Sequence, residues 1–305
     1  MNDLRVLVLG GGGMLGHKLF QTLTGRCDVY ATFRRYDGRL KQTGVFETKR
    51  VVDGVDAWDL RAVSRALSEV RPTWVVNCIG IIKQLAEARD PKTSIYINAL
   101  FPHLLSELCA KASARLVHIS TDCIFTGSRG SYVEGDPSDA EDLYGKTKFL
   151  GELDYPHALT LRTSVVGRDL FSDVSLVDWF LSQAGKRVKG YTNAIYTGLS
   201  TEALSQEIWR IMSQLPELQG LYHVSTNTIT KFALLQLLNE SFQARVTIDP
   251  FDGVHCDRSL MSDRYRRATG FTPPSWEAMV ASMARDPTPY DRFREVVDSG
   301  RAHGV

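Results

Sequence analysis

The sequence predicts an α/β fold with a doubly wound parallel sheet, and two observations support this prediction. Short apolar runs that suit buried strands alternate with amphipathic helical segments through the first half of the chain. Glycine-rich or polar stretches follow these runs directly, where the carboxyl ends of parallel strands meet in such a sheet. The alternation requires right-handed crossovers, which place helices on both faces of the sheet.

The elements of the first half follow from periodicity and from end signals. Strands are expected at 4–9, 28–32, 73–78 and 115–120, because each is a short apolar run. Helices are expected at 14–24, at 60–70 with Asp59 as N-cap, at 91–112 and across DLYGKTKFLGE at 142–152. Pro102 lies inside the third helix and should kink it.

The second half has a looser pattern and no clean linker. Helices are expected at 200–215, 230–241, 263–269 and 275–283, with a short strand at 220–225. We therefore expect a first domain over residues 1–165 and a smaller C-terminal α/β lobe over 166–305, interleaved with it. The helix near 200–215 is expected to pack on the sheet of the first domain.

Composition excludes several classes of protein. The 305 residues carry 36 basic and 35 acidic side chains with no basic block, which argues against a nucleic-acid partner. The five cysteines show no C-x-x-C spacing, so we expect free thiols in a reducing cytosol and no metal. No signal-peptide pattern begins the chain, and no apolar run approaches the about 20 residues that a membrane span needs. A cytoplasmic protein without a membrane partner is expected.

A glycine pattern follows the first strand and opens the first helix. Gly10, Gly13 and Gly16 form G-x-x-G-x-x-G. Glycine serves where a turn needs positive φ and where a pyrophosphate must touch the backbone, and the following helix N-terminus attracts that phosphate. Dinucleotide binding is the preferred interpretation, and a plain strand-to-helix turn is the alternative.

Two arginines follow the second strand, where the acidic residue of NAD-binding proteins usually stands. Arg34 and Arg35 suit the 2′-phosphate of NADPH, because guanidinium groups bind phosphate through paired N–H donors. NADPH is therefore expected, with NADH the weaker candidate. Asp37 comes shortly after and is able to fold back toward a ribose. The alternative is a solvated charged loop.

Tyr144 and Lys148 are four residues apart on the expected helix and so share a face. An ammonium group, together with an oxidised nicotinamide, should lower the pKa of a phenol and suit it to proton transfer to a carbonyl oxygen. Thr121, at the end of a strand in HISTD, is placed to hold the same oxygen. The alternative is three unrelated surface features.

These motifs resemble a known family. VLGGGGMLG, NCIG, HISTDCIF, YGKTKFLGE and LRTSVVG are similar to the extended short-chain dehydrogenases/reductases, and most similar to the dTDP-4-dehydrorhamnose reductases among them. The resemblance runs over nearly the full length, and it implies a Rossmann-type sheet with a C-terminal substrate lobe. It also implies a catalytic set, further cofactor contacts and substrate contacts. The catalytic set is Thr121, Tyr144, Lys148 and Asn98. The further cofactor contacts are Met14, Leu15, Asp56, Asn77, Cys78 and Gly80. The substrate contacts are Asp122, Lys83 and Val165.

Two of the implied roles have ordinary alternatives, and two segments depart from the subgroup. Asn98 can instead bond its own helix backbone, and Asp56 can be a loop or capping residue. Val165 stands where the subgroup commonly has tryptophan, and Lys83 with Gln84 would line the pocket mouth. These departures leave the sugar and its nucleotide open.

The expected function is NADPH-dependent reduction of a nucleotide-linked 4-keto-6-deoxy sugar, with Tyr144 as proton donor. By analogy the product would serve dTDP-rhamnose or other polysaccharide biosynthesis, and the assembly would be a homodimer. One alternative is a nucleotide-sugar epimerase or dehydratase. Arg34 and Arg35 argue against it, and the Thr-Asp-Glu pattern of dehydratases is absent, because Cys123 follows Asp122. The other is a non-catalytic NADP-binding subunit like that of methionine adenosyltransferase.

Overall fold

A central sheet of seven parallel strands organises the chain in a computed structural model, which describes residues 4–83 and 86–294. The strand order is β11-β6-β5-β4-β1-β2-β3, so the order reverses between β1 and β4. Ligands bind such sheets at the carboxyl ends of the strands, next to this reversal. The strands are β1 (Arg5–Leu9), β2 (Asp28–Thr32), β3 (Val51–Val52), β4 (Trp74–Asn77), β5 (Arg115–Thr121), β6 (Ala158–Thr163) and β11 (Gly220–His223).

Helices cover both faces of this sheet, which confirms the doubly wound fold. On one face α1 (Met14–Leu23) and α8 (Thr201–Gln214) pack together over Val6, Val8 and Val117. On the other face α3 (Leu60–Val70) and α5 (Phe101–Lys111) bury a second core with Leu7 and Val75. Successive strand residues thus point to opposite cores, and both faces are apolar because both are covered.

Local signals set most of the element ends. Asp59 caps α3 through hydrogen bonds from the backbone N–H groups of Arg61 and Ala62, as the sequence predicted. Ser200 caps α8 in the same way. Short elements were not predicted, because they have too few residues to show a period. They are α2 (Gly38–Gln42), α7 (Leu176–Leu181), β3, β7 (Val165–Val166), β8 (Arg187–Tyr191), β9 (Ala194–Tyr196), β10 (Leu199–Ser200), β12 (Ile229–Thr230), β13 (Thr247–Phe251) and β14 (Cys256–Asp257). The strand β6 of the central sheet was not predicted either.

The helical stretch around Pro102 contains a π-helical segment. It runs from α4 (Pro91–Ser94) through η3 (Ile95–Leu100), which has the wider π-helical winding, into α5. Pro102 lies in the first turn of α5, where its missing N–H is tolerated. The expected disturbance is therefore an extra-wide turn before the proline, a feature often found at functional sites. Asn98 lies within this turn.

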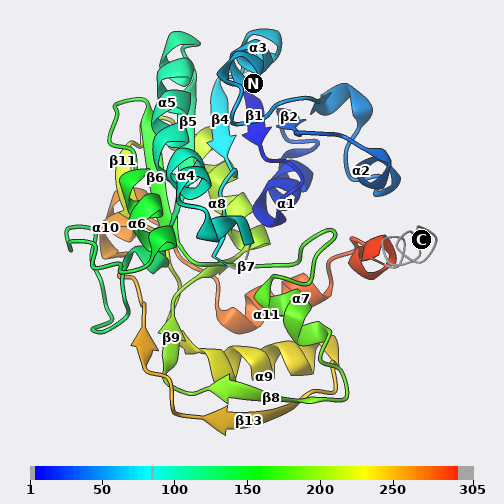
Figure 1. Cartoon of the computed structure of the whole chain (residues 1–305), viewed down its shortest axis with the longest axis vertical. Coiled ribbons are helices and arrows are strands. Elements are labelled where there is room, and N and C mark those ends of the chain that lie inside the picture. Colours follow the sequence, from blue (N-terminus) through cyan, green and yellow to red (C-terminus); the bar gives the residue numbers. More distant parts are fainter. Residues whose placement is uncertain (1–3, 84–85, 295–305) are drawn as a thin grey trace.

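The C-terminal part forms a second layer beyond the carboxyl ends of the central strands (Figure 1). Figure 1 shows β8 (Arg187–Tyr191), β13 (Thr247–Phe251) and α9 (Lys231–Phe242) farthest from the sheet. The remaining helices are α6 (Leu143–Leu150), α10 (Asp263–Thr269) and α11 (Trp276–Ala284). The chain crosses between the two parts more than once, because β11 and α8 follow residue 165 and yet belong to the sheet layer. No helix in the described part of the chain is long and apolar enough to cross a membrane.

Candidate active site

The glycine loop between β1 and α1 is shaped by backbone contacts. Gly10 has φ +78°, a conformation that favours glycine. A Cβ on Gly16 would lie 2.1 Å from the carbonyl oxygen of Gly10, so the helix approaches the strand end closely only because no side chain intervenes. Around Gly13 there is ordinary room, since a Cβ would lie 3.4 Å from that same oxygen.

The first turn of α1 fits a phosphate group. Gly13 is its N-cap, and no side chain caps the free N–H groups of the turn that holds Met14, Leu15 and Gly16. The turn has no acidic residue to repel an anion. Uncapped donors at a helix N-terminus behind a glycine loop are what a pyrophosphate needs. The sequence-predicted residues of this loop therefore meet at one place.

The two arginines after β2 are exposed, and neither makes an ion pair with another described side chain. Arg34 and Arg35 are thus free to meet a phosphate. Asp37 is not available for a ribose, because its carboxylate accepts hydrogen bonds from the backbone N–H groups of Arg39 and Leu40 and caps α2. The acidic side chain whose position would favour NAD therefore serves as a helix cap.

The residues after β4 are held by the π-helical turn. Asn98 Oδ1 accepts from the Ile81 N–H at 2.9 Å, and its Nδ2 donates to the Ile81 carbonyl at 3.0 Å. This two-way bond fixes the loop after β4, and Gly80 lies directly against Asn98. Asn98 therefore bonds another segment rather than its own helix. Asn77 caps the same loop by accepting from the Ile79 N–H.

Two further predicted cofactor residues lie at neighbouring strand ends. Cys78 donates its backbone N–H to the Leu9 carbonyl and faces Gly10 across the switch between β1 and β4. Asp56 follows β3 and accepts a hydrogen bond from the Trp58 N–H at 3.0 Å. This is the ordinary turn role that was its alternative, and the carboxylate stays partly exposed.

The proposed catalytic side chains meet between β5 and α6. Thr121 ends β5, and Tyr144 and Lys148 lie on the side of α6 that packs against this strand. Lys148 is buried and donates to the Ile119 carbonyl at 2.8 Å. The Thr121 hydroxyl is close enough to the Tyr144 phenol to form a hydrogen bond that lowers the pKa of the phenol. A threonine hydroxyl, a phenol and an ammonium thus share one corner of the sheet edge.

Two glycines bring α6 into this position, and their role was not predicted from the sequence. A Cβ on Gly145 would lie 2.3 Å from the carbonyl oxygen of Cys123, two residues after Thr121. A Cβ on Gly151 would lie 1.9 Å from the carbonyl oxygen of Asn98. The helix is therefore pressed against the strand end at its start and against the π-helical turn at its end.

The protein's own groups raise the pKa of Tyr144, whereas a lowered pKa was expected from the sequence. Burial raises the pKa of its phenol, the acidic side chains of Cys123 and Asp122 raise it further, and the Thr121 hydroxyl lowers it. Tyr144 is therefore protonated at neutral pH, which is the form that gives a proton. Burial also lowers the pKa of Lys148 to about 8, against the attraction of Glu152.

A buried ion pair underlies these strand ends. Arg162 of β6 donates from Nε to Glu152 Oε1 at 2.7 Å and from Nη2 to Oε2 at 2.6 Å. The Ser120 hydroxyl donates to the same carboxylate at 2.6 Å. Both charged side chains are under 10% exposed, at 4% and 7%. Ser120 precedes Thr121, so this pair holds the end of β5 in place.

The loop after Thr121 is contacted by residues from both parts of the chain. Asp122 is buried, and burial raises the pKa of its carboxyl while Arg258 lowers it. Arg258 donates to the Phe125 carbonyl at 2.8 Å and approaches Cys123 Sγ at 3.8 Å. Sequence reasoning missed Arg258, because it lies 135 residues from Cys123 and no local pattern signals such a contact.

The other predicted substrate residues are placed less centrally. Lys83 Nζ lies 2.6 Å from Asp142 Oδ2, and Asp142 is the N-cap of α6, so Lys83 is tied to the start of that helix. Val165 is half-buried in β7 and pairs with Leu199. Gln84 lies outside the described residues.

Comparison with known proteins gives consistent results. The chain matches the family described as RmlD substrate binding domain over residues 4–288. A spore coat polysaccharide biosynthesis protein of Bacillus subtilis is 28% identical over 236 residues, which cover 74% of each chain. A dTDP-4-dehydrorhamnose reductase of Streptomyces griseus is 33% identical over 149 residues, which cover 48% of this chain and only 43% of that relative.

A solved structure shares the fold. It is that of a dTDP-4-dehydrorhamnose reductase from Bacillus anthracis in complex with NADP. The TM-score is 0.76 at 21% identity, and the match covers 92% of this chain and 98% of the other. Identity at this level speaks for the fold, and the chemistry must be argued from the site.

Proposed function

The chain belongs to the RmlD substrate binding domain family, and on this premise we propose that it is an NADPH-dependent reductase of a nucleotide-linked 4-keto-6-deoxy sugar. The observation that carries the proposal is the meeting of Thr121, Tyr144 and Lys148 at the end of β5, on the same carboxyl-end edge of the sheet as the uncapped N-terminus of α1. The relatives named as dTDP-4-keto-6-deoxy-D-glucose and dTDP-4-dehydrorhamnose reductases support the substrate class.

The residues present fit a bound NADPH. Gly10, Gly13 and Gly16 with the backbone of Met14 and Leu15 would hold the pyrophosphate, and Arg34 with Arg35 the 2′-phosphate. Asn77, Cys78 and Gly80 would line the cofactor beside β1, and Asp56 the adenine side. When bound, NADPH supplies the hydride for the ketone carbon.

The chain's own side chains would handle the proton and the oxygen. Tyr144 gives its proton to the ketone oxygen, since its phenol is protonated at neutral pH. Thr121 holds that oxygen by a hydrogen bond. Lys148 orients the cofactor ribose and stabilises the phenolate that remains. Asn98 fixes the loop that borders them, and Asp122, Lys83 and Val165 face the sugar side.

NADPH oxidation tests the function directly. The purified chain should bleach NADPH absorbance with at least one member of a panel of nucleotide-linked 4-keto-6-deoxy sugars that carry dTDP, UDP or another nucleotide. Turnover in the absence of added NADPH, with isomerised sugar as product, would point to an epimerase instead. NADP binding without turnover on any sugar would contradict the reductase and favour a binding subunit.

Cofactor preference should depend on the two exposed arginines. Changing Arg34 and Arg35 together to Ala should weaken NADPH binding at least about tenfold while leaving NADH binding nearly unchanged, since a hydrogen bond to a charged group contributes about 1.5–3 kcal/mol. Titration of both nucleotides against the variant measures this. Arg61→Ala, an equally exposed arginine on α3, is the control and should change neither affinity. Equal losses for both nucleotides would overturn the 2′-phosphate assignment.

Affinity for NADPH should also depend on pH through Lys148. Its pKa of about 8 means that the ammonium is present below that pH and is lost as the pH rises through it. We expect the NADPH dissociation constant of the wild type to rise above pH of about 8. In Lys148→Met the affinity should be weaker and flat over the same range. A wild-type profile as flat as that of the variant would contradict this role.

We further propose the division into a cofactor domain over residues 1–165 and a substrate lobe over 166–305. A homodimer in the cytoplasm is the assembly and location that the family relationship favours. Sedimentation of the purified chain tests the dimer. We propose that the product serves dTDP-rhamnose biosynthesis or the biosynthesis of another polysaccharide precursor, which the names of the relatives support.

A further inference from the structure

A small pocket lies outside all the residues assigned so far. Its walls are Arg39 and Gln42 of α2, Phe171 of the loop after β7, and Arg292 with Phe293 near the end of the described chain. The cavity measures about 190 Å³. This is below the range of about 300–1,000 Å³ of sites for drug-sized ligands, so it has room for one ring system with the rest of a ligand on the rim.

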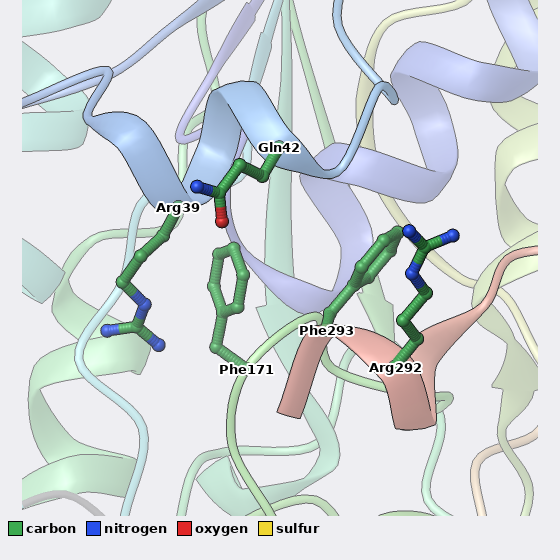
Figure 2. A pocket seen from close by; sticks show the side chains of 5 residues that line it. All are labelled: Arg39, Gln42, Phe171, Arg292 and Phe293. Carbon is green, nitrogen blue, oxygen red and sulfur yellow. The ribbon is translucent and has the colours of Figure 1, made fainter. Parts of the chain in front are cut away.

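Two phenyl rings border the opening of the pocket (Figure 2). Figure 2 shows Phe171 and Phe293 on either side of the opening, with the amide of Gln42 over Phe171. The guanidinium of Arg39 lies 4.6 Å from the ring centre of Phe171. Arg292 extends beyond Phe293 on the opposite side. A flat ring in the opening would be stacked between two phenyl rings.

Charge at the rim favours an anion. Arg39 and Arg292 are both exposed, and neither makes an ion pair with a side chain in 4–83 or 86–294. The neighbouring Asp291 is already bound to Arg168, and Asp37 caps α2. Among the described residues, neither guanidinium group beside the aromatic slot has an ion-pair partner, and the Gln42 amide offers an NH2 donor and a carbonyl acceptor.

We propose that this pocket binds a nucleoside phosphate, with the base between Phe171 and Phe293, the Gln42 amide on the edge of the base, and the phosphate on one of the two rim arginines, Arg39 or Arg292, which lie on opposite sides of the slot. The chemistry is that of aromatic stacking plus guanidinium–phosphate contacts. The ligand is a free nucleotide, because under the proposed function Arg34, Arg35 and Asp56 already hold the adenosine 2′-phosphate end of the cofactor and none of them lines this pocket.

Calorimetric titration of the full chain with ADP, with and without saturating NADPH, tests the proposal. The double variant Arg39→Gln/Arg292→Gln should lose at least about tenfold in nucleotide affinity, whereas Lys41→Gln on the same helix should bind as the wild type does. ADP binding that persists beside NADPH and falls in the double variant identifies a free-nucleotide site. ADP binding that NADPH abolishes would place ADP in the cofactor site and would overturn the proposal.

Wild-type affinity for ADP in the double variant would also overturn the proposal. Both arginines are exposed, so the variant should keep the wild-type melting temperature. Phe171→Leu provides a second test, since it keeps an apolar side chain in the wall but removes the ring, and it should weaken ADP by about tenfold. These experiments measure nucleotide binding and not sugar reduction, so they test the pocket even if the chain reduces no sugar.

Discussion

Tyr144→Phe should lower kcat by about 10²–10⁴ with little change in the dissociation constant of NADPH. The substitution removes one oxygen, and general acid catalysis by a positioned side chain is worth about that factor. A tyrosine is protonated at neutral pH even at its ordinary pKa near 10, and burial raises the pKa of Tyr144 further, so the wild type carries the proton that it donates. The measurement is the rate of NADPH oxidation at saturating sugar nucleotide.

A second tyrosine gives a matched control. Tyr155 lies just beyond α6, its side chain is exposed, and its hydroxyl bonds His103 at 3.0 Å. Tyr155→Phe should leave kcat unchanged, because this hydroxyl is not in the catalytic set. Full activity in Tyr144→Phe would show that another group protonates the ketone oxygen and would remove the basis of the proposed mechanism.

The sequence predicted the parts of the site that lie close together along the chain. The glycine pattern, the arginine pair and the i, i+4 relation of Tyr144 and Lys148 are local, so spacing alone reveals them. Likewise, α3 and its Asp59 cap lie where periodicity and capping placed them, because an amphipathic helix with a strong N-cap needs no distant partner to be recognised.

What could not be predicted depends on contacts between distant segments. The close approach of α6 to the end of β5 requires Gly145 against Cys123, and in the sequence this glycine is only a small residue within a helix. Arg258 reaches the loop after Thr121 from the far end of the chain. The direction of the Tyr144 pKa was also missed, because burial of the phenol, which raises the pKa, is a property of the packed fold.

The buried pair of Glu152 and Arg162 leads to the largest expected effect on stability. Removing one partner of a buried ion pair leaves an uncompensated charge, which costs about 3–5 kcal/mol. We therefore expect Glu152→Gln to lower the free energy of unfolding by about that amount, measured from the urea midpoint at an unchanged slope. The loss arises because Arg162 stays buried without its counter-charge, and the amide NH2 of glutamine cannot accept from one of the two Arg162 donors.

An exposed pair of the same geometry separates burial from pairing. Arg187 and Asp249 also make two hydrogen bonds, at 3.1 and 2.6 Å, but their side chains are 70% and 44% exposed. Asp249→Asn should cost under about 1 kcal/mol. Equal losses in the two variants would mean that burial is not what makes the Glu152 pair matter.

In Glu152→Gln the pKa of Lys148 should fall further, because Glu152 raises it, so NADPH affinity should begin to decline at a lower pH than in the wild type. The same carboxylate would then connect the stability of the strand ends with the charge state of the proposed catalytic lysine.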